Sequence, residues 1–220
     1  MTLTLPLFPL RVVLFPGRPL PLHIFEPRYQ DLLADVLAAD RRFGVVAIRQ
    51  GAEVGIASEI HTIGTVAEVE EVEHHDDGQA DIATRGVERF RVVELLDDRA
   101  YLRARVEPCD ERLPEPAVRN GALREPTATL RRLLGPYLAD LGAPQEMLEH
   151  LPSDPSELSW LAAAALQVDV AEQQRLLELD AVDERLTATT RLLRRESGIV
   201  RHLGTMASLN PPGPGGAELN

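Results

Sequence analysis

The chain has 220 residues, of which 44% are hydrophobic and 26% charged, and its formal net charge is −12. This composition is typical of a globular protein with one large or two small domains, and the acidic balance disfavours nucleic acid as a general partner. All 23 basic residues are arginine, which excludes a P-loop lysine, a Ser-Lys hydrolytic dyad and a Schiff-base mechanism, because each needs a lysine amine.

The N-terminal segment LPLFPLRVVLFPGRPLPLHIFEPRYQDLL, residues 5–33, is apolar but contains six prolines. Proline at this density prevents a continuous helix, and the segment lacks the basic start and the cleavage site of a signal peptide. The chain has no unbroken apolar run of about 20 residues, the length that crosses a membrane. We therefore expect a cytoplasmic protein without a membrane span, in which this segment supplies an edge strand and irregular arches over a β-barrel.

Alternating apolar and polar residues dominate the rest of the first half. Strands are expected over 43–48, 62–75, 86–96 and 101–107, turns at Asp77-Gly78 and Asp97-Asp98, and a short amphipathic helix from Glu26-Pro27. The spacing of three between Val69 and Val72 breaks the alternation and predicts a β-bulge near Glu70-Glu71. Residues 1–108 are thus expected to form a mainly β unit.

The second half is predicted to be helical. A proline-bounded linker is expected over 109–116, a helical bundle over 117–205 and a disordered tail over 206–220. Asp154 and Asp169 each precede a glutamate by three residues and predict capped helix starts, and Asp180 is expected to open the last helix in the same way.

Two glycines are expected to interrupt helices. Gly135-Pro136 should break or kink the helix that carries the apolar stripe from Leu130 to Leu141, and Gly204 should end the last helix. The exposed side of that last helix is expected to carry Arg191, Arg194, Arg195 and Glu196.

Five segments resemble the N-terminal substrate-binding domain of Lon proteases, in chain order and over about residues 3–203. They are LPLFPLRVVLFPGRPLPLHIFEPRY, FGVVAI, IGTVAEVEEV, DGQADIATRGVERFRV and AEQQRLLELDAVDERL. The resemblance implies an α+β fold, in which a PUA-like β pseudo-barrel with one short helix precedes a helical bundle that ends in a long helix.

The resemblance also implies a function. It indicates a bacterial-type module that recognises unfolded or degron-bearing polypeptides and links them to a separate protease or chaperone. The ATPase and Ser-Lys peptidase modules of Lon proteases have no match in these residues, so we expect no enzyme activity, no catalytic residue and no cofactor.

Ten residues match the family motifs and are candidates for a structural or a binding role. They are Phe15, Pro16, His23, Phe25, Glu26, Arg28, Tyr29, Gly86, Arg89 and Phe90. For Glu26 and Arg28 we favour a satisfied structural ion pair, because buried charges need partners. His23 is expected to be a hydrogen-bonded core residue, and Gly86 to allow a tight turn into its strand.

Two charged groups have alternative interpretations. The run His74-His75-Asp76-Asp77 offers metal-competent side chains, but neighbours on a strand face opposite ways and no second ligand cluster is apparent, so a solvated hairpin tip is favoured over a metal site. Four arginines on two strands that are expected to pair, Arg89, Arg91, Arg103 and Arg105, indicate either cross-strand charge compensation or a stripe for binding RNA. Compensation is favoured, because an acidic segment lies in the same barrel.

The lone cysteine and the lone tryptophan are expected to be structural. Cys109 cannot form an intrachain disulfide, and acidic neighbours should raise its pKa and leave an inert thiol. Trp160 is expected in the core of the helical bundle. An apolar groove between barrel and bundle would favour polypeptide binding, whereas an unbroken arginine stripe would favour RNA.

Overall fold

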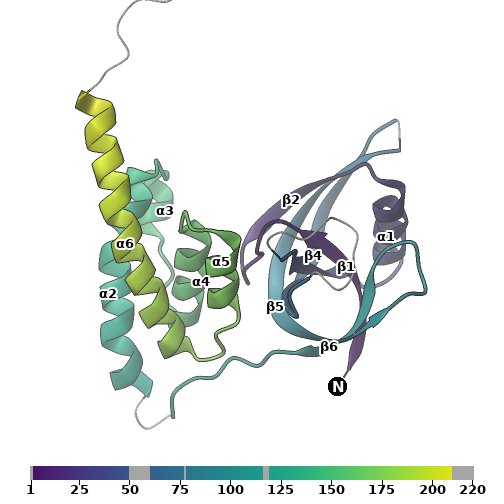
Figure 1. Ribbon diagram of the computed structural model, residues 1–220, viewed down its shortest axis with the longest axis horizontal. Coiled ribbons are helices and arrows are strands. Elements are labelled where there is room, and N and C mark those ends of the chain that lie inside the picture. The colour runs from purple at the N-terminus through teal and green to yellow at the C-terminus, as the bar shows by residue number, and fades with distance from the viewer. Residues whose placement is uncertain (1, 50–59, 77, 116–118, 210–220) are drawn as a thin grey trace, which may run out of the picture.

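The computed structural model describes residues 2–49, 60–76, 78–115 and 119–209. These residues form a β-barrel beside a bundle of helices, which confirms the predicted α+β class (Figure 1). The strands are β1 Leu3–Leu10, β2 Pro19–Ile24, β3 Arg42–Ala47, β4 Ile63–His74, β5 Ala80–Leu96 and β6 Arg103–Pro108. The helices are α1 Pro27–Leu37, α2 Arg119–Asp140, α3 Gln145–Glu149, α4 Pro155–Ala165, α5 Val170–Leu177 and α6 Val182–Leu209.

The strands follow the order β2-β5-β4-β3-β1-β6, and β6 pairs again with β5, so that the sheet closes into a barrel. The long strand β5 pairs with β2 over residues 80–85 and with β6 over residues 90–96. Among the described strands β2 pairs with β5 only, and it is the edge strand that the proline-rich segment predicts.

Strand β1 accommodates two prolines because each half has a partner on one side. Residues 3–6 pair with β6 and residues 7–10 pair with β3. Pro6 and Pro9 lie in different halves. Because each half pairs on one side, the missing N–H group of each proline need not remove a ladder hydrogen bond.

The predicted β-bulge in β4 is confirmed. Val69 lies opposite Thr84 and Glu71 opposite Ala83, so Glu70 is the additional residue. A second shift places Thr65 opposite Arg89 and Ala67 opposite Gly86. This shift adds a residue to β5, and the alternation in β4 did not predict it.

Helix α1 begins as the sequence predicts, with Glu26 at the N-cap and Pro27 at the first helical position. Its apolar side buries Tyr29, Leu32, Leu33 and Val36. The Tyr29 ring stacks on Phe8 of β1 with the ring centroids 4.0 Å apart. The helix therefore covers the part of the barrel that faces away from the bundle (Figure 1).

The helical half corrects one alternative of the prediction for Gly135-Pro136, because α2 continues through both residues and does not break there. Leu134 and Tyr137 on either side are fully or almost fully buried in the bundle core. Glycine before proline lacks the Cβ that would clash with the pyrrolidine ring in a helical conformation. The stabilisation from packing the flanking apolar residues thus outweighs the loss of the one backbone hydrogen bond that proline cannot donate.

The two predicted caps are present. Asp154 accepts a hydrogen bond from the backbone N–H of Glu157 at 3.0 Å, and Asp169 accepts one from Glu172 at 2.7 Å. Asp180 was wrongly predicted to cap the last helix, since α6 starts at Val182 and the Asp180 carboxylate contacts Arg89.

The end of α6 also differs from the prediction. The helix continues past Gly204 to Leu209, so residues 206–209 are helical, and residues 210–220 of the predicted tail lie outside the described residues. Arg191, Arg194 and Arg195 are exposed as expected. Glu196 is buried instead, and its carboxylate accepts a hydrogen bond from Arg195.

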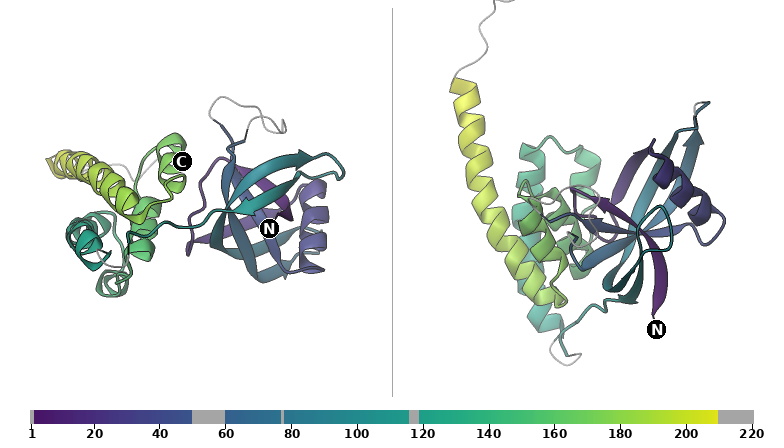
Figure 2. Two further views of the ribbon diagram at one scale, coloured as in Figure 1. Left: turned by 90° about the horizontal axis from the view of Figure 1, so that it is seen from below. Right: turned by 45° about the vertical axis from the view of Figure 1, so that its right-hand side comes forward.

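One hydrophobic core extends from the barrel into the bundle. Phe15 and Ile63 from the barrel belong to the same buried cluster as Leu158 and Trp160 of α4. The segment from Cys109 to Glu115 runs extended from β6 to the bundle (Figure 2). Packing therefore holds the two halves together in addition to the covalent connection. In the described part of the chain, no helix is long and apolar enough to cross a membrane.

Candidate functional site

A cleft of about 670 Å³ lies where the barrel meets the bundle. Its lining comes from the segment before β2, from β5, from the segment after β6 and from α4: Pro16, Gly17, Arg18, Arg85, Gly86, Val87, Glu88, Arg89, Cys109, Glu111, Ser156, Glu157 and Trp160. Three of the ten motif residues are in this lining. The location agrees with the expected groove, but the lining is mixed and strongly charged instead of apolar.

Trp160 forms the buried side of the cleft. Two guanidinium groups lie against its ring, with the Cζ atom of Arg89 at 5.5 Å and that of Arg185 at 3.4 Å from the ring centroid. The Phe15 ring lies 5.9 Å away. Trp160 is a bundle core residue, as predicted, and it also contacts the barrel.

Arg89 joins the barrel to the bundle. Its side chain is 3% exposed, and Nη1 donates to the carbonyl of Leu177 at 2.8 Å and lies 3.1 Å from a carboxylate oxygen of Asp180. Among the described residues, Nη2 of Arg89 has no hydrogen-bond partner. Arg89 therefore holds the junction, and its Nη2 atom is shielded from solvent.

Arg185 of α6 is fully buried beneath Trp160 and was missed by the sequence analysis. Its guanidinium donates to the Ser159 hydroxyl at 2.7 Å and to the Glu111 carboxylate. Burial lowers the pKa of Arg185 to about 10, so the group stays charged at neutral pH. The sequence signal for its burial was its position between Val182 and Leu186, on the apolar side of the helix.

Arg18 supplies a second unsatisfied donor. Burial lowers the pKa of its guanidinium, the nearby Arg85 lowers this pKa further and Glu157 raises it. In the part of the chain that the structure describes, Nε of Arg18 has no hydrogen-bond partner. Nε of Arg18 and Nη2 of Arg89 are both shielded from solvent, so a ligand in the cleft would meet more exposed groups of the lining, such as the guanidinium group of Arg85.

Cys109 also lines the cleft but is poorly suited to nucleophilic chemistry. Burial is the main cause that raises the pKa of its thiol, Arg89 and Arg91 lower it, and Asp180 and Asp110 raise it. The direction agrees with the sequence analysis, whereas the main cause is burial and not the acidic neighbours. At neutral pH the thiol is protonated and weakly reactive.

Gly86 is needed so that the segment before β2 can lie close to β5, and not for the predicted turn. It lies inside β5, where its N–H donates to Arg18 O at 2.9 Å and its carbonyl accepts from Gly17 N at 2.8 Å. A Cβ atom at position 86 would lie 2.4 Å from the carbonyl oxygen of Phe15. The glycine thus lets the segment after Phe15 lie directly against β5.

The remaining motif residues divide between the barrel core and the region around the start of α1. Phe15 and Phe90 are each 1% exposed, and Pro16 is half-buried. Glu26 and Arg28 form the predicted ion pair at 2.8 Å, although both side chains are about one third exposed rather than buried. Phe25 is 59% exposed at a small pocket of about 270 Å³ that Tyr29 and Leu22 also line.

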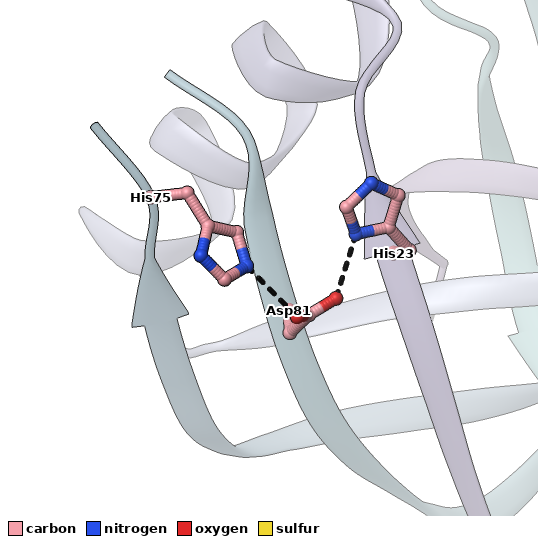
Figure 3. A group of neighbouring side chains, drawn as sticks. All are labelled: His23, His75 and Asp81. Carbon is pink, nitrogen blue, oxygen red and sulfur yellow. Dashed lines mark hydrogen bonds and ion pairs between the residues drawn. The ribbon is translucent and has the colours of Figure 1, made fainter. Parts of the chain in front are cut away.

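His23 was wrongly predicted to be a core residue. Its side chain is 51% exposed, and Nδ1 lies 2.7 Å from a carboxylate oxygen of Asp81, whose other oxygen lies 2.8 Å from Nε2 of His75 (Figure 3). The three ligand atoms lie within 4.8 Å of one another. The sequence showed no further ligands for His75. The structure provides them as His23 of β2 and Asp81 of β5.

The four arginines of the predicted RNA stripe are largely compensated. Arg89 is buried, Arg103 contacts Asp98 at 2.6 Å, and Arg105 forms an ion pair with Glu94 on the neighbouring strand. This arrangement favours charge compensation over a nucleic-acid surface.

Comparison with known proteins relates the whole arrangement to one family. Residues 4–195 match the family described as ATP-dependent protease La (LON) substrate-binding domain. Over 199 residues the chain is 31% identical to Lon protease 2 of Myxococcus xanthus, which covers 90% of this chain and 24% of that protein. It is 32% identical over 200 residues to the Lon protease of Trichlorobacter lovleyi, covering 87% and 24%. The chain thus spans about a quarter of the length of these relatives.

Two solved structures have a similar fold. A Lon N-terminal domain protein from Xanthomonas campestris matches with a TM-score of 0.61 and 26% identity, covering 84% of this chain and 95% of that one. The N-terminal domain of the Mycobacterium avium complex Lon protease matches with a TM-score of 0.69 and 18% identity, covering 87% and 98%.

Proposed function

The chain belongs to the family of ATP-dependent protease La (LON) substrate-binding domains, and from this membership we propose that it is a non-enzymatic module that binds unfolded or degron-bearing polypeptides. The observation that supports a location for this binding is the cleft around Trp160, whose lining includes the exposed side chains of Arg85 and Val87.

An unfolded polypeptide fits the chemistry of this cleft. Its backbone carbonyls are exposed, and they can accept hydrogen bonds from the exposed guanidinium group of Arg85 regardless of sequence. Val87 on the rim is 39% exposed and offers an apolar contact to client side chains. A folded protein pairs its carbonyls internally, so the cleft should discriminate against it.

The affinity should be modest. A disordered client loses conformational freedom when it is held, and one cleft offers few contacts to compensate for that loss. We expect micromolar dissociation constants, on the order of 8 kcal/mol of binding free energy.

We further propose that a bound client passes in the cytoplasm to a separate protease or chaperone. The full-length relatives are Lon proteases, and the 220 residues of this chain contain no lysine for a Ser-Lys dyad or a P-loop. The chain by itself should therefore neither hydrolyse ATP nor cleave an unfolded protein.

The test compares one client in two states. A reduced, carboxymethylated client and the same protein in its native form are titrated into labelled chain, and the change in fluorescence anisotropy gives each dissociation constant. Micromolar binding of the unfolded form with much weaker binding of the native form supports the proposal. Equal binding of both forms, or no binding up to high micromolar concentration, refutes it.

A further inference from the structure

A group of two histidines and one aspartate lies on the barrel, and none of the three residues lines the cleft. The three side chains come from three adjacent strands or their ends. His23 of β2 lies directly opposite Asp81 of β5. On the other side of β5, Asp81 lies opposite Glu73, and His75 is two residues further on. Because side chains alternate along a strand, His75 shares the outward face with Asp81 and His23 (Figure 3).

The group is open to solvent and already converges on one point. The side chains of His23, His75 and Asp81 are exposed to 51%, 37% and 52%. Figure 3 shows both rings directed at the Asp81 carboxylate from opposite sides. One nitrogen from each ring and one carboxylate oxygen lie within 4.8 Å of one another.

A neighbouring amide lies against the His23 ring. Nε2 of His23 lies 2.7 Å from Oε1 of Gln79, an oxygen that can accept a hydrogen bond from this nitrogen when Nδ1 binds a metal ion. In the neutral ring the lone pair is then on Nδ1, the atom that faces Asp81. Metal-ligating histidines usually donate their other ring N–H to such an oxygen, which fixes the tautomer and the orientation of the ring.

The Asp81 carboxylate connects the two rings. One of its oxygens lies 2.7 Å from Nδ1 of His23, and the other lies 2.8 Å from Nε2 of His75.

We propose that His23, His75 and Asp81 form a surface site for Zn²⁺. Two imidazole nitrogens and one carboxylate oxygen are a ligand set that zinc accepts, and they leave a fourth position for water. The N···O distances of 2.7 and 2.8 Å would open to roughly 3.3 Å around a tetrahedral ion with bonds of about 2.0–2.2 Å. Exposed side chains can make that adjustment by rotating. Mg²⁺ and Ca²⁺ prefer oxygen ligands and fit this set poorly.

The bound ion would clamp the edge strand to the β4–β5 hairpin. Strand β2 pairs with β5 only, among the strands that the structure describes, and His23 lies one residue before its end. Phe25 follows at once, with its ring 5.9 Å from that of His23. Zinc would therefore stabilise the end of β2 and the exposed aromatic side chain beside it.

The test uses the complete chain, without an affinity histidine tag and after treatment with a chelator. Isothermal titration with Zn²⁺ should give one ion per chain, and Co²⁺ should give the visible absorption of a tetrahedral complex. Asp81→Asn and His75→Ala should each weaken Zn²⁺ binding at least about tenfold. His74→Ala is the matched control, because His74 is an exposed histidine on the same hairpin outside the group, and it should leave the affinity unchanged.

A measurement on the unmodified chain removes any dependence on the folding of the variants. Nuclear magnetic resonance of the histidine rings should show that Zn²⁺ shifts the signals of two of the six histidines. Absence of Zn²⁺ binding up to millimolar concentration, a loss of affinity in His74→Ala equal to that in His75→Ala, or a response spread over all six rings would overturn the proposal.

Discussion

Nη1 of Arg89 on β5 lies 2.8 Å from the carbonyl oxygen of Leu177 at the end of α5, and this hydrogen bond joins the barrel to the helical bundle. The donor is charged and almost fully buried, so the bond is stronger than one between neutral groups. The relationship explains why a charged residue of a barrel strand lies inside the protein.

Replacing Arg89 with methionine should destabilise the protein. The variant keeps most of the side-chain volume but leaves the carbonyls of Leu177 and Leu179 without this donor, at a cost of about 2 kcal/mol in the free energy of unfolding. Urea denaturation, followed by the fluorescence of the single tryptophan, measures the change. Arg91→Met on the same strand is exposed and should change stability by less than about 0.5 kcal/mol. Equal effects of the two substitutions would contradict the account.

Gly86→Ala should also destabilise the protein, because the added Cβ would lie 2.4 Å from the backbone oxygen of Phe15. We expect a loss of roughly 1–3 kcal/mol, since backbone atoms must move to make room. Gly198→Ala is the matched substitution in α6, where a Cβ would meet open space, and it should stabilise the protein by about 0.5–1 kcal/mol. Thermal melting of both variants tests this opposition in sign. A neutral Gly86→Ala would show that the close approach is not required.

Stability should fall when the pH rises above about 10. Burial, the hydrogen bond from Tyr101 to Asp35 at 2.5 Å and the charge of Asp35 raise the pKa of Tyr101 to about 12. Between pH 10 and pH 12 the unfolded chain loses this proton first, so unfolding becomes more favourable as the pH rises. Asp35→Asn should lower the pKa of Tyr101, which the absorbance of tyrosinate reports. Ionisation of all three tyrosines near pH 10 in the folded protein would contradict the prediction.

Several elements could be predicted because their signals are local. Pro27 after Glu26, the spacing of Val69 and Val72, and the aspartates at two helix starts each identify a feature within a few residues. The same local logic failed for Asp180, because a carboxylate that meets Arg89 across the junction does not cap a helix.

The candidate sites depend on contacts between distant residues. His23 and Asp81 are brought together by the pairing of β2 with β5, 58 positions apart in sequence. The charged lining of the cleft likewise results from the packing of α4 against β5 and the segment before β2. Periodicity predicts which elements form, but it does not state which of their polar side chains meet.

Binding of random RNA or DNA at physiological salt should be weak or absent. Arg103 and Arg105 are engaged by carboxylates, and the net charge of −12 opposes association with phosphates. Electrophoretic mobility shift or anisotropy titration over a series of salt concentrations measures this. A submicromolar dissociation constant with a steep salt dependence, lost when Arg91, Arg103 and Arg105 become alanine, would make nucleic acid the main partner.

The central claim is that the cleft between barrel and bundle binds unfolded polypeptide, and matched variants on one strand test it most directly. Val87 lines the cleft and is 39% exposed, whereas Val93 of the same strand is 53% exposed and lies outside the cleft lining. The measurement is the dissociation constant of one carboxymethylated client for the unmodified chain, Val87→Asp, Val93→Asp and Phe25→Asp.

We predict that Val87→Asp weakens client binding at least about tenfold, equivalent to about 1.4 kcal/mol. Val93→Asp and Phe25→Asp should bind the client as the unmodified chain does. Unchanged binding by Val87→Asp, or a loss confined to Phe25→Asp at the small pocket before α1, would contradict the assignment of the cleft.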